Sequence, residues 1–389
     1  MEYFQDSRKL PMPHLPELKQ VEEDLSMWLT PLPLIFIPTL AIYIVGMMLT
    51  RCCGQTIIAN IMGERLSVKP NTMRQRLREL TYEKSAKRGT NRSEWQVTSC
   101  FAPLLRWVMS RFDSEQRQLV LAMDATYLRD RFTILAISVV VNGCAIPVAF
   151  HIQAGSEKGE WNPIWQRLLG YLDEVVDDSW TVSVLADGGL YSRSLFRYIR
   201  DQLHWHPHMR IGTQGLYRTA NSSWQPLAQL ATPGMVPCVC EVICFKGTPL
   251  TCTLLVQWDP SYDKPCLVVT DLAFDHACLE TYSLRFWIEA GFKSFKRGFF
   301  GWEQTKMQDP QRAERLWLVM SIAQFYLLSY GNLDTDDLTF DTFSARSLSC
   351  LTRGWINFLL ALIDSRPLPE PKPFRYPSLP LPYCSKTYP

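Results

Sequence analysis

The alternation of apolar strands and amphipathic helices between residues 118 and 214 restricts the fold of this chain more than any other feature. Three strand-like runs come first, and the second and third are joined at "NGC" (142–144), a typical hairpin turn. A helix, a strand, a second helix and a last strand follow at 160–176, 181–186, 193–203 and 209–214. Strands that alternate with helices predict an α/β domain in which crossovers pair strands in parallel.

Two acids interrupt these apolar strands. Asp124 lies within "LVLAMDATYL" (119–128), and Asp187 lies within "TVSVLADGGLYS" (181–192). A buried carboxylate is costly unless it is paired or bound to a metal. A turn hydrogen bond for Asp124 and a helix N-cap for Asp187 are the structural alternatives. A three-stranded meander followed by alternating helices and strands predicts that the first and fourth strands are neighbours, which would bring the two acids together.

A third acid lies in "YSLRFWIEAGFKSFK" (282–296), which has the pattern of an amphipathic helix. At 100° per residue its polar side chains fall within an arc of about 80°. They are Tyr282, Arg285, Glu289, Lys293 and Lys296, whereas Leu284, Ile288 and Phe295 are expected to face a core. One interpretation is a solvated face with a weak Glu289–Lys293 ion pair. The other is a helix laid across the two strand acids, so that three carboxylates could hold two divalent ions beside phosphate-binding cations.

The segment before this domain is basic and helical. Between Arg51 and Glu94 there are ten Lys or Arg residues and four Glu, a net charge of +6, whereas the whole chain of 389 residues carries only +2. A helix, the break "SVKPN" (67–71) and a second helix predict a helix-turn-helix. The second helix would bury Met73, Leu77 and Leu80 and expose Arg74, Gln75 and Arg78. An ordinary helical bundle with a solvated basic face is the alternative.

The uncharged run at 31–50 is long enough for a membrane span. Pro31, Pro33 and Pro38 interrupt its first half, however, so a buried core helix is the favoured prediction. The acidic, proline-containing first thirty residues do not resemble a cleavable signal peptide.

The cysteines and histidines favour structural roles over metal binding. Twelve scattered cysteines in a chain of this length indicate reduced thiols in a cytosolic protein. Cys238, Cys240, Cys244 and Cys252 lack the usual zinc-ligand spacing, so core strand positions are favoured. His204, His206 and His208 occupy alternate positions. This spacing fits a row of metal ligands on one strand face or, as we favour, a loop that enters a strand.

The spacing of Tyr282, Arg285, Glu289 and Lys296 resembles the Y-(2)-R-(3)-E-(6)-K signature of DDE transposases from bacterial insertion sequences. "AMDAT" around Asp124 and "LADGGLYS" around Asp187 are similar to the two Asp motifs of that family, and the resemblance covers about residues 50–330. It implies an α/β fold with an RNase H-like mixed sheet and flanking helices, interrupted by a β-rich insertion and preceded by an all-α DNA-binding domain.

The resemblance and the local patterns together predict the domain organisation. The expected parts are an N-terminal helical domain at 1–110, an RNase H-like catalytic domain at 115–212 and 273–330, a β-rich insertion at 213–272, a C-terminal helical region at 331–365 and a Pro-rich tail at 366–389. The tail has eight prolines in 24 residues and is expected to be extended or disordered.

The resemblance also implies roles for single residues. Asp124, Asp187 and Glu289 would be catalytic metal ligands for two Mg²⁺ ions, with Mn²⁺ able to substitute. DNA contacts are expected from Tyr282, Arg285, Lys293, Lys296, Arg74, Gln75 and Arg78.

The implied protein is a transposase that binds terminal inverted repeats and performs cut-and-paste transposition through a hairpin. It would act on double-stranded DNA as a homodimer in the paired-end complex, in the cytoplasm at the nucleoid and without a membrane. The alternatives are a related metal-dependent nuclease and a catalytically silent DNA-binding protein derived from a transposase.

Overall fold

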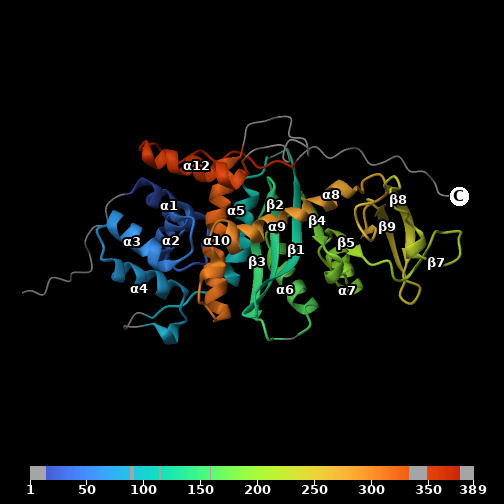
Figure 1. Cartoon of the computed structure of the whole chain (residues 1–389), viewed down its shortest axis with the longest axis horizontal. Helices are drawn as coiled ribbons and strands as arrows, with labels where there is room; N and C mark the ends of the chain where they lie inside the picture. Colours follow the sequence, from blue (N-terminus) through green and yellow to red (C-terminus); the bar gives the residue numbers. More distant parts are fainter. Residues whose placement is uncertain (1–14, 88–91, 114, 158, 333–347, 377–389) are drawn as a thin grey trace, which may run out of the picture.

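The structure is a computed structural model that describes residues 15–87, 92–113, 115–157, 159–332 and 348–376. The N-terminal helices up to residue 81 pack on one side of the long helix α10 (Pro310–Gly331), and the central sheet lies on its other side together with the helix at Phe101–Met109 (Figure 1). The outer strands of the sheet extend away from α10.

The central sheet has the order β3-β2-β1-β4-β5. Its strands are β1 (Gln118–Leu128), β2 (Phe132–Val141), β3 (Cys144–Ala154), β4 (Thr181–Ala186) and β5 (His206–Ile211). β2 runs antiparallel to β1 and β3, whereas β1, β4 and β5 are parallel to one another. The crossovers are α6 (Asn162–Asp173) and α7 (Arg193–Arg197), the latter continued by a π-helical turn at Tyr198–Gln202. This is the RNase H-like arrangement, and the predicted fold class is confirmed.

The β-rich block at 213–272 continues the same sheet. Its strands are β6 (Leu216–Arg218), β7 (Gln225–Pro226), β8 (Cys238–Cys244), β9 (Leu250–Gln257) and β10 (Cys266–Thr270). β10 pairs antiparallel with β5, so ten strands form one sheet in which the insertion is attached edge to edge. The cysteines predicted for strands lie in β8 and β9.

The N-terminal helices are α1 (Pro16–Trp28), α2 (Ile37–Thr50), α3 (Gln55–Arg65), α4 (Pro70–Thr81) and α5 (Phe101–Met109). Residues 40–48 of α2 are all buried, as predicted for a core helix. Among the described residues, no single helix has both the length and the apolar composition to cross a membrane. The bent pair Leu34–Thr50 and Gln55–Arg65, which meets at 104°, satisfies both criteria when taken together.

Helix α10 connects the two halves of the molecule. Most of its residues from Ala313 to Gly331 are buried, because it contacts β3, α2, α4 and α12 (Cys350–Ile363). Arg315 is 2% exposed and donates to the Thr81 carbonyl oxygen (2.9 Å) and to Glu94 (2.5 Å). Arg312 pairs with Glu83 at 2.7 Å, and this hydrogen bond lowers the pKa of the Glu83 carboxyl to about 2. The N-terminal part of the chain is thus attached to the half of the molecule that contains the sheet by buried or half-buried ion pairs.

The last described residues form a strap across the start of β1. Phe374 is fully buried against Phe112, and its backbone exchanges hydrogen bonds with Arg111 and Asp113. The Tyr376 hydroxyl accepts a hydrogen bond from the Val120 N–H at 2.9 Å. This first part of the Pro-rich tail is extended and packed, while 377–389, like 333–347 of the expected C-terminal region, lies outside the described residues.

Helices α10 and α12 cross at two glycines, Gly331 and Gly354. A Cβ atom at residue 354 would collide with the carbonyl oxygen of Leu327, and one at residue 331 would collide with that of Cys350. The absence of side chains at both positions therefore allows the two backbones to touch.

Replacing Gly354 with Ala tests this crossing. In a helix interior Ala is normally more stable than Gly by about 1 kcal/mol. Because the backbones are in contact, we expect Gly354→Ala instead to lower the free energy of unfolding by about 1–3 kcal/mol in thermal or urea unfolding. Gly170→Ala in α6 is the matched control, since its Cβ would meet only the Tyr198 hydroxyl at 3.4 Å and should stabilise the helix. If Gly354→Ala and Gly170→Ala stabilised the protein equally, the backbone contact between α10 and α12 would be contradicted.

Candidate active site

The parallel pairing of β1 with β4 brings the first two acids together. Met123 is opposite Ala186 in the last registered pair of these strands, and Asp124 and Asp187 are the next residue in each. Asp124 remains inside β1, because β1 continues along β2 where Asp124 is opposite Ala136. Its Oδ1 accepts the Ala125 N–H at 2.7 Å, whereas the Asp187 side chain caps no helix. The N-cap alternative for Asp187 is therefore excluded.

The segment that carries Glu289 is helical but not one regular helix. It consists of α8 (Leu279–Ser283), a 3₁₀ turn (Leu284–Phe286), α9 (Trp287–Lys293) and a π-helical turn (Ser294–Gly298). The prediction of a uniform α-helix was wrong here, because a 3₁₀ turn rotates each residue by about 120° and shifts the preceding side chains relative to those that follow. Leu284, Ile288 and Phe295 are fully buried, as expected.

The change in helical pitch divides the polar residues of this segment into two groups. Tyr282 and Arg285 are 3% and 5% exposed, respectively. Tyr282 packs against Val268 of β10, and its hydroxyl donates to the Ala186 carbonyl oxygen at 3.5 Å, beside Asp187. Glu289 and Lys293 are exposed, and Lys296 is half-buried. The buried pair therefore holds the segment against the sheet, while the other three side chains face the open side.

Glycine at position 291 sets how closely α9 approaches the sheet. A Cβ atom there would lie 3.1 Å from both the Cβ and the carbonyl oxygen of Ala145 in β3. The close approach to β3 therefore fixes how near α9, which also carries Glu289, lies to the sheet.

The three acids influence one another electrostatically. Burial raises the pKa of the Asp124 carboxyl, and the charges of Asp187 and Glu289 raise it further, while Arg285 and the Ala125 N–H oppose the change. Arg285 lies 3.5 Å from Asp124 Oδ2 and 3.6 Å from Glu289 Oε1. Arg210 of β5 lies 3.7 Å from Asp187 Oδ1. Three carboxylates and two arginines therefore form one charged cluster at the ends of β1 and β4.

A pocket of about 440 Å³ opens beside this cluster. It is lined by Asp124, Ala125, Thr126, Glu289, Phe292, Lys293, Lys296, Arg297 and Glu303. Burial lowers the pKa of the Lys296 ammonium, and the nearby charges of Glu303 and, to a smaller extent, Asp124 partly offset this. The pocket therefore combines carboxylates and cations, with Glu289 and Lys293 one turn apart on α9, which suits a phosphodiester and its associated cations.

The donor set fits a divalent cation in its chemistry. Carboxylate oxygens are the preferred ligands of Mg²⁺, and the mutual repulsion of the three acids would be relieved by such an ion. Within the described residues, no three His, Cys, Asp or Glu side chains are already gathered at metal-binding distances. Arg285 instead pairs with two of the three carboxylates.

A sheet of this order, with acids following β1 and β4 and a third acid on a covering helix, defines an RNase H-like protein with a polyacidic site. The chain belongs to the family of DDE-domain transposases, because the family model described as "Transposase DDE domain" matches residues 115–325. Members of this family act on DNA, which they cleave, and generally use divalent metal ions. No curated protein matches the chain.

Solved structures with similarity to this chain include two transposase complexes. The piggyBac transposase synaptic complex with hairpin DNA is 9% identical, covers 87% of this chain and 76% of its own, and has a TM-score of 0.40. The Mos1 strand transfer complex is 13% identical, with coverages of 52% and 60% and a TM-score of 0.18. Human ENDOV is 11% identical, with coverages of 58% and 97% and a TM-score of 0.24.

The predicted DNA-reading residues lie on α4, separated from the acids by α10. Met73, Leu77 and Leu80 are buried as expected. Arg74 and Arg78 are exposed, and Gln75 is half-buried and donates to Glu79 at 2.7 Å. The exposed face of α4 therefore carries two arginines.

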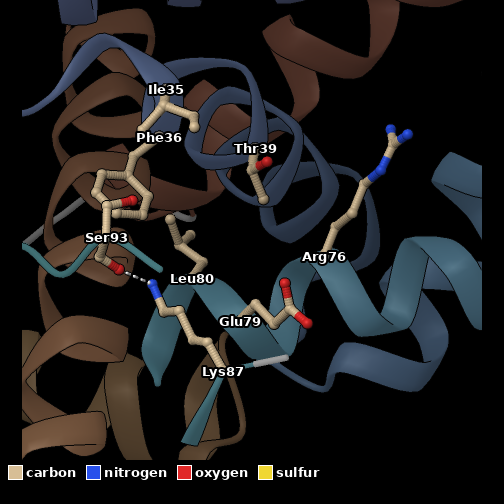
Figure 2. Close-up of a pocket in the computed structure, with 8 residues that line it drawn as sticks. All are labelled: Ile35, Phe36, Thr39, Arg76, Glu79, Leu80, Lys87 and Ser93. Carbon is tan, nitrogen blue, oxygen red and sulfur yellow. Dashed lines mark hydrogen bonds between the residues drawn. The ribbon is translucent and has the colours of Figure 1, made fainter. Parts of the chain in front are cut away.

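Figure 2 shows a pocket of about 140 Å³ between α4 and the start of α2. The Lys87 ammonium donates to the Ser93 carbonyl oxygen at 2.6 Å and lies 4.7 Å from the centre of the Phe36 ring. Burial lowers the pKa of Lys87. These contacts tie the chain that follows α4 back to the helix bundle, and so contribute to fixing the orientation of α4.

Sequence reasoning did not identify Arg210. The available signal was a cation inside the strand run "MRIGTQ", which is as unusual in a sheet as the acids of β1 and β4. Arg210 shares a strand face with His206 and His208, since the three alternate along β5.

The three alternating histidines at 204, 206 and 208 do not form a metal site within the described residues. His206 Nδ1 lies 3.1 Å from Asp271 Oδ2, and His204 precedes the strand with a φ of 57°. His208 is fully buried, and neither ring nitrogen has a hydrogen-bond partner among the described residues. The favoured interpretation, a loop that enters a strand, is confirmed.

Burial lowers the pKa of His208 to about 4. The unfolded chain takes up a proton on this ring as the pH falls below about 6.5, whereas the folded protein does so only near pH 4. Stability should therefore be lost on acidification across this window, by up to about 1.4 kcal/mol per pH unit. We expect His208→Met to flatten the pH dependence of urea unfolding between these limits. His276 is exposed, so His276→Asn is the control and should keep the wild-type dependence of unfolding free energy on pH. An unchanged pH dependence in His208→Met would contradict the lowered pKa of His208.

Proposed function

We propose that this transposase binds the terminal inverted repeats of a mobile DNA element through its N-terminal helices and uses Asp124, Asp187 and Glu289 for DNA cleavage and strand transfer. The observation that carries the proposal is the registered pairing of β1 with β4, which brings two acids together under the helix of the third. The matched signature supports the assignment of the three residues.

In this proposal the three carboxylates hold two Mg²⁺ ions, and Mn²⁺ can replace them. The ions, when bound, activate the attacking oxygen and stabilise the leaving oxygen of the phosphodiester. Lys293 and Lys296 bind DNA phosphates along the pocket wall. Tyr282 positions the segment through its contact at the end of β4. Arg285 is near enough to the acids to contact a DNA phosphate that approaches them.

The proposed reaction is cut-and-paste transposition through a hairpin at the element ends, in a homodimer that pairs two ends at the nucleoid. The freed 3′-hydroxyl then attacks a phosphodiester of the target. Two half-buried tryptophans in the insertion are available to stack on an unpaired base, which is worth about 1–3 kcal/mol per base. Trp224 lies under the Arg218 guanidinium at 5.2 Å, and Trp258 donates to the Tyr262 carbonyl oxygen at 2.9 Å.

The role of the acids is tested with Asp124→Asn, Asp187→Asn and Glu289→Gln. Each change keeps the side-chain shape and removes a charge, so cleavage and joining of linear end DNA should fall by orders of magnitude. Gel-shift affinity for the same DNA should persist or increase slightly, since an anion near the phosphates is lost. Asp275→Asn removes an exposed carboxylate outside the cluster and should cleave like the wild type. Wild-type cleavage by Glu289→Gln would exclude Glu289 from the site.

The DNA-reading role of α4 predicts a separate phenotype. Arg74→Ala should weaken binding to end DNA by about 1–3 kcal/mol if this guanidinium contacts a base edge. Its effect on unrelated DNA should be smaller, which competition gel shifts would measure. Lys19→Ala removes another exposed cation, from α1, and serves as the control. Unchanged affinity after replacement of Arg74, Gln75 and Arg78 together would show that another surface reads the ends.

A further inference from the structure

Each carboxylate of the site has an arginine partner. Arg285 joins Asp124 to Glu289, at 3.5 Å and 3.6 Å, and Arg210 lies 3.7 Å from Asp187. The five groups together carry one net negative charge. A single divalent cation would reverse that sign, and two would leave a positive cluster. The arginines therefore supply, in this structure, the positive charge that metal ions would otherwise supply.

Arg285 is held in place more by burial than by strong hydrogen bonds. Its side chain is 6% exposed, and its guanidinium carbon lies 4.8 Å from the centre of the Phe286 ring. Charge-assisted hydrogen bonds normally measure about 2.7–2.9 Å, which is shorter than both of its contacts with carboxylates. Its Nε has no hydrogen-bond partner among the described residues. These contacts are loose enough to be exchanged for others.

A guanidinium and a divalent cation cannot both lie between Asp124 and Glu289 without repulsion. Arg remains protonated at all relevant pH values, so it cannot relieve the conflict by losing a proton. A phosphate group in the neighbouring pocket, beside Lys293 and Lys296, offers Arg285 an alternative anionic partner. Planar bidentate contact with phosphate suits a guanidinium better than its present long contacts.

We propose that Arg285 is an exchangeable counter-charge that couples metal loading to DNA binding. Without DNA it pairs with Asp124 and Glu289 and weakens cation binding there. When DNA enters, Arg285 moves to a phosphate and releases both carboxylates to the cation. This inference rests on the proposed function, since it takes Asp124 and Glu289 as metal ligands. It gives Arg285 a positioning and regulatory role in addition to a DNA contact.

The first test measures Mn²⁺ binding in the absence of DNA, from the paramagnetic resonance signal of free Mn²⁺. Arg285→Gln should bind Mn²⁺ more tightly than the wild type, by about 5–50-fold, a range typical of coupling between sites. Arg297→Gln is the matched control. Arg297 lines the same pocket and pairs with Glu303, so its loss changes the charge equally without touching the three acids. It should leave Mn²⁺ affinity near the wild-type value.

The second test adds linear end DNA. DNA should tighten Mn²⁺ binding in the wild type and do so less in Arg285→Gln, in which the carboxylates are already released. By reciprocity of coupled binding, Ca²⁺ should raise the DNA affinity of the wild type more than that of the variant. Cleavage by Arg285→Gln should fall although its metal affinity rises, because its phosphate contact is lost. This opposite movement distinguishes the proposed role from a purely structural one.

The proposal is overturned if folded Arg285→Gln binds Mn²⁺ no more tightly than the wild type or than Arg297→Gln. If Arg285→Gln does not fold, Arg285→Lys decides, because lysine keeps the charge but cannot contact both carboxylates as a fork. A folded Arg285→Lys with wild-type Mn²⁺ affinity would then overturn it. The variant Glu289→Gln shows whether the Arg285 proposal alone is wrong or the proposed metal site is wrong as well. Wild-type Mn²⁺ binding and cleavage by Glu289→Gln would reject the site itself, whereas loss of both leaves only the Arg285 proposal in question.

Discussion

The parallel register between β1 and β4 is the constraint on which the site depends. Side chains alternate between the two faces of a strand, so a slip of one residue would turn Asp124 or Asp187 to the opposite face. The register is stable because nine of the twelve paired residues before the acids are apolar and buried, on both faces of the sheet. Each acid directly follows these apolar pairs in its strand. The packing of the core therefore determines where the two carboxylates lie.

Helix α10 provides the second constraint, because it is packed on all sides. The sheet lies against one side, α2 and α4 lie against another, and α12 crosses its end at paired glycines. Buried Arg315 satisfies backbone and carboxylate oxygens of the N-terminal helices that would otherwise be left without a partner. Movement of α4 relative to the sheet would therefore leave the buried Arg315 guanidinium without its partners, which is costly.

Local patterns in the sequence predicted the strands, the neighbouring acids and the core helix at 31–50, because periodicity and the topology of crossovers determine them. Sequence patterns could not predict that β10 pairs with β5, since that contact depends on long-range edge matching. They also missed the burial of Tyr282 and Arg285, because a 3₁₀ turn and a π turn alter the angle per residue. The pairing of Arg210 with Asp187 depends on which strands become neighbours, and so emerges only from the assembled sheet.

The strap formed by Phe374 and Tyr376 has a consequence for the order of assembly during synthesis. The Val120 N–H at the start of the first sheet strand finds its partner in a residue 256 positions later in the chain. During synthesis this contact cannot form until the segment around Tyr376 has left the ribosome, long after β1 has been made. Until then the Phe112 ring, which packs on Trp180, lacks the aromatic cover that Phe374 and Tyr376 provide. A chain that lacked Phe374 and Tyr376 would expose this apolar edge and be prone to aggregation.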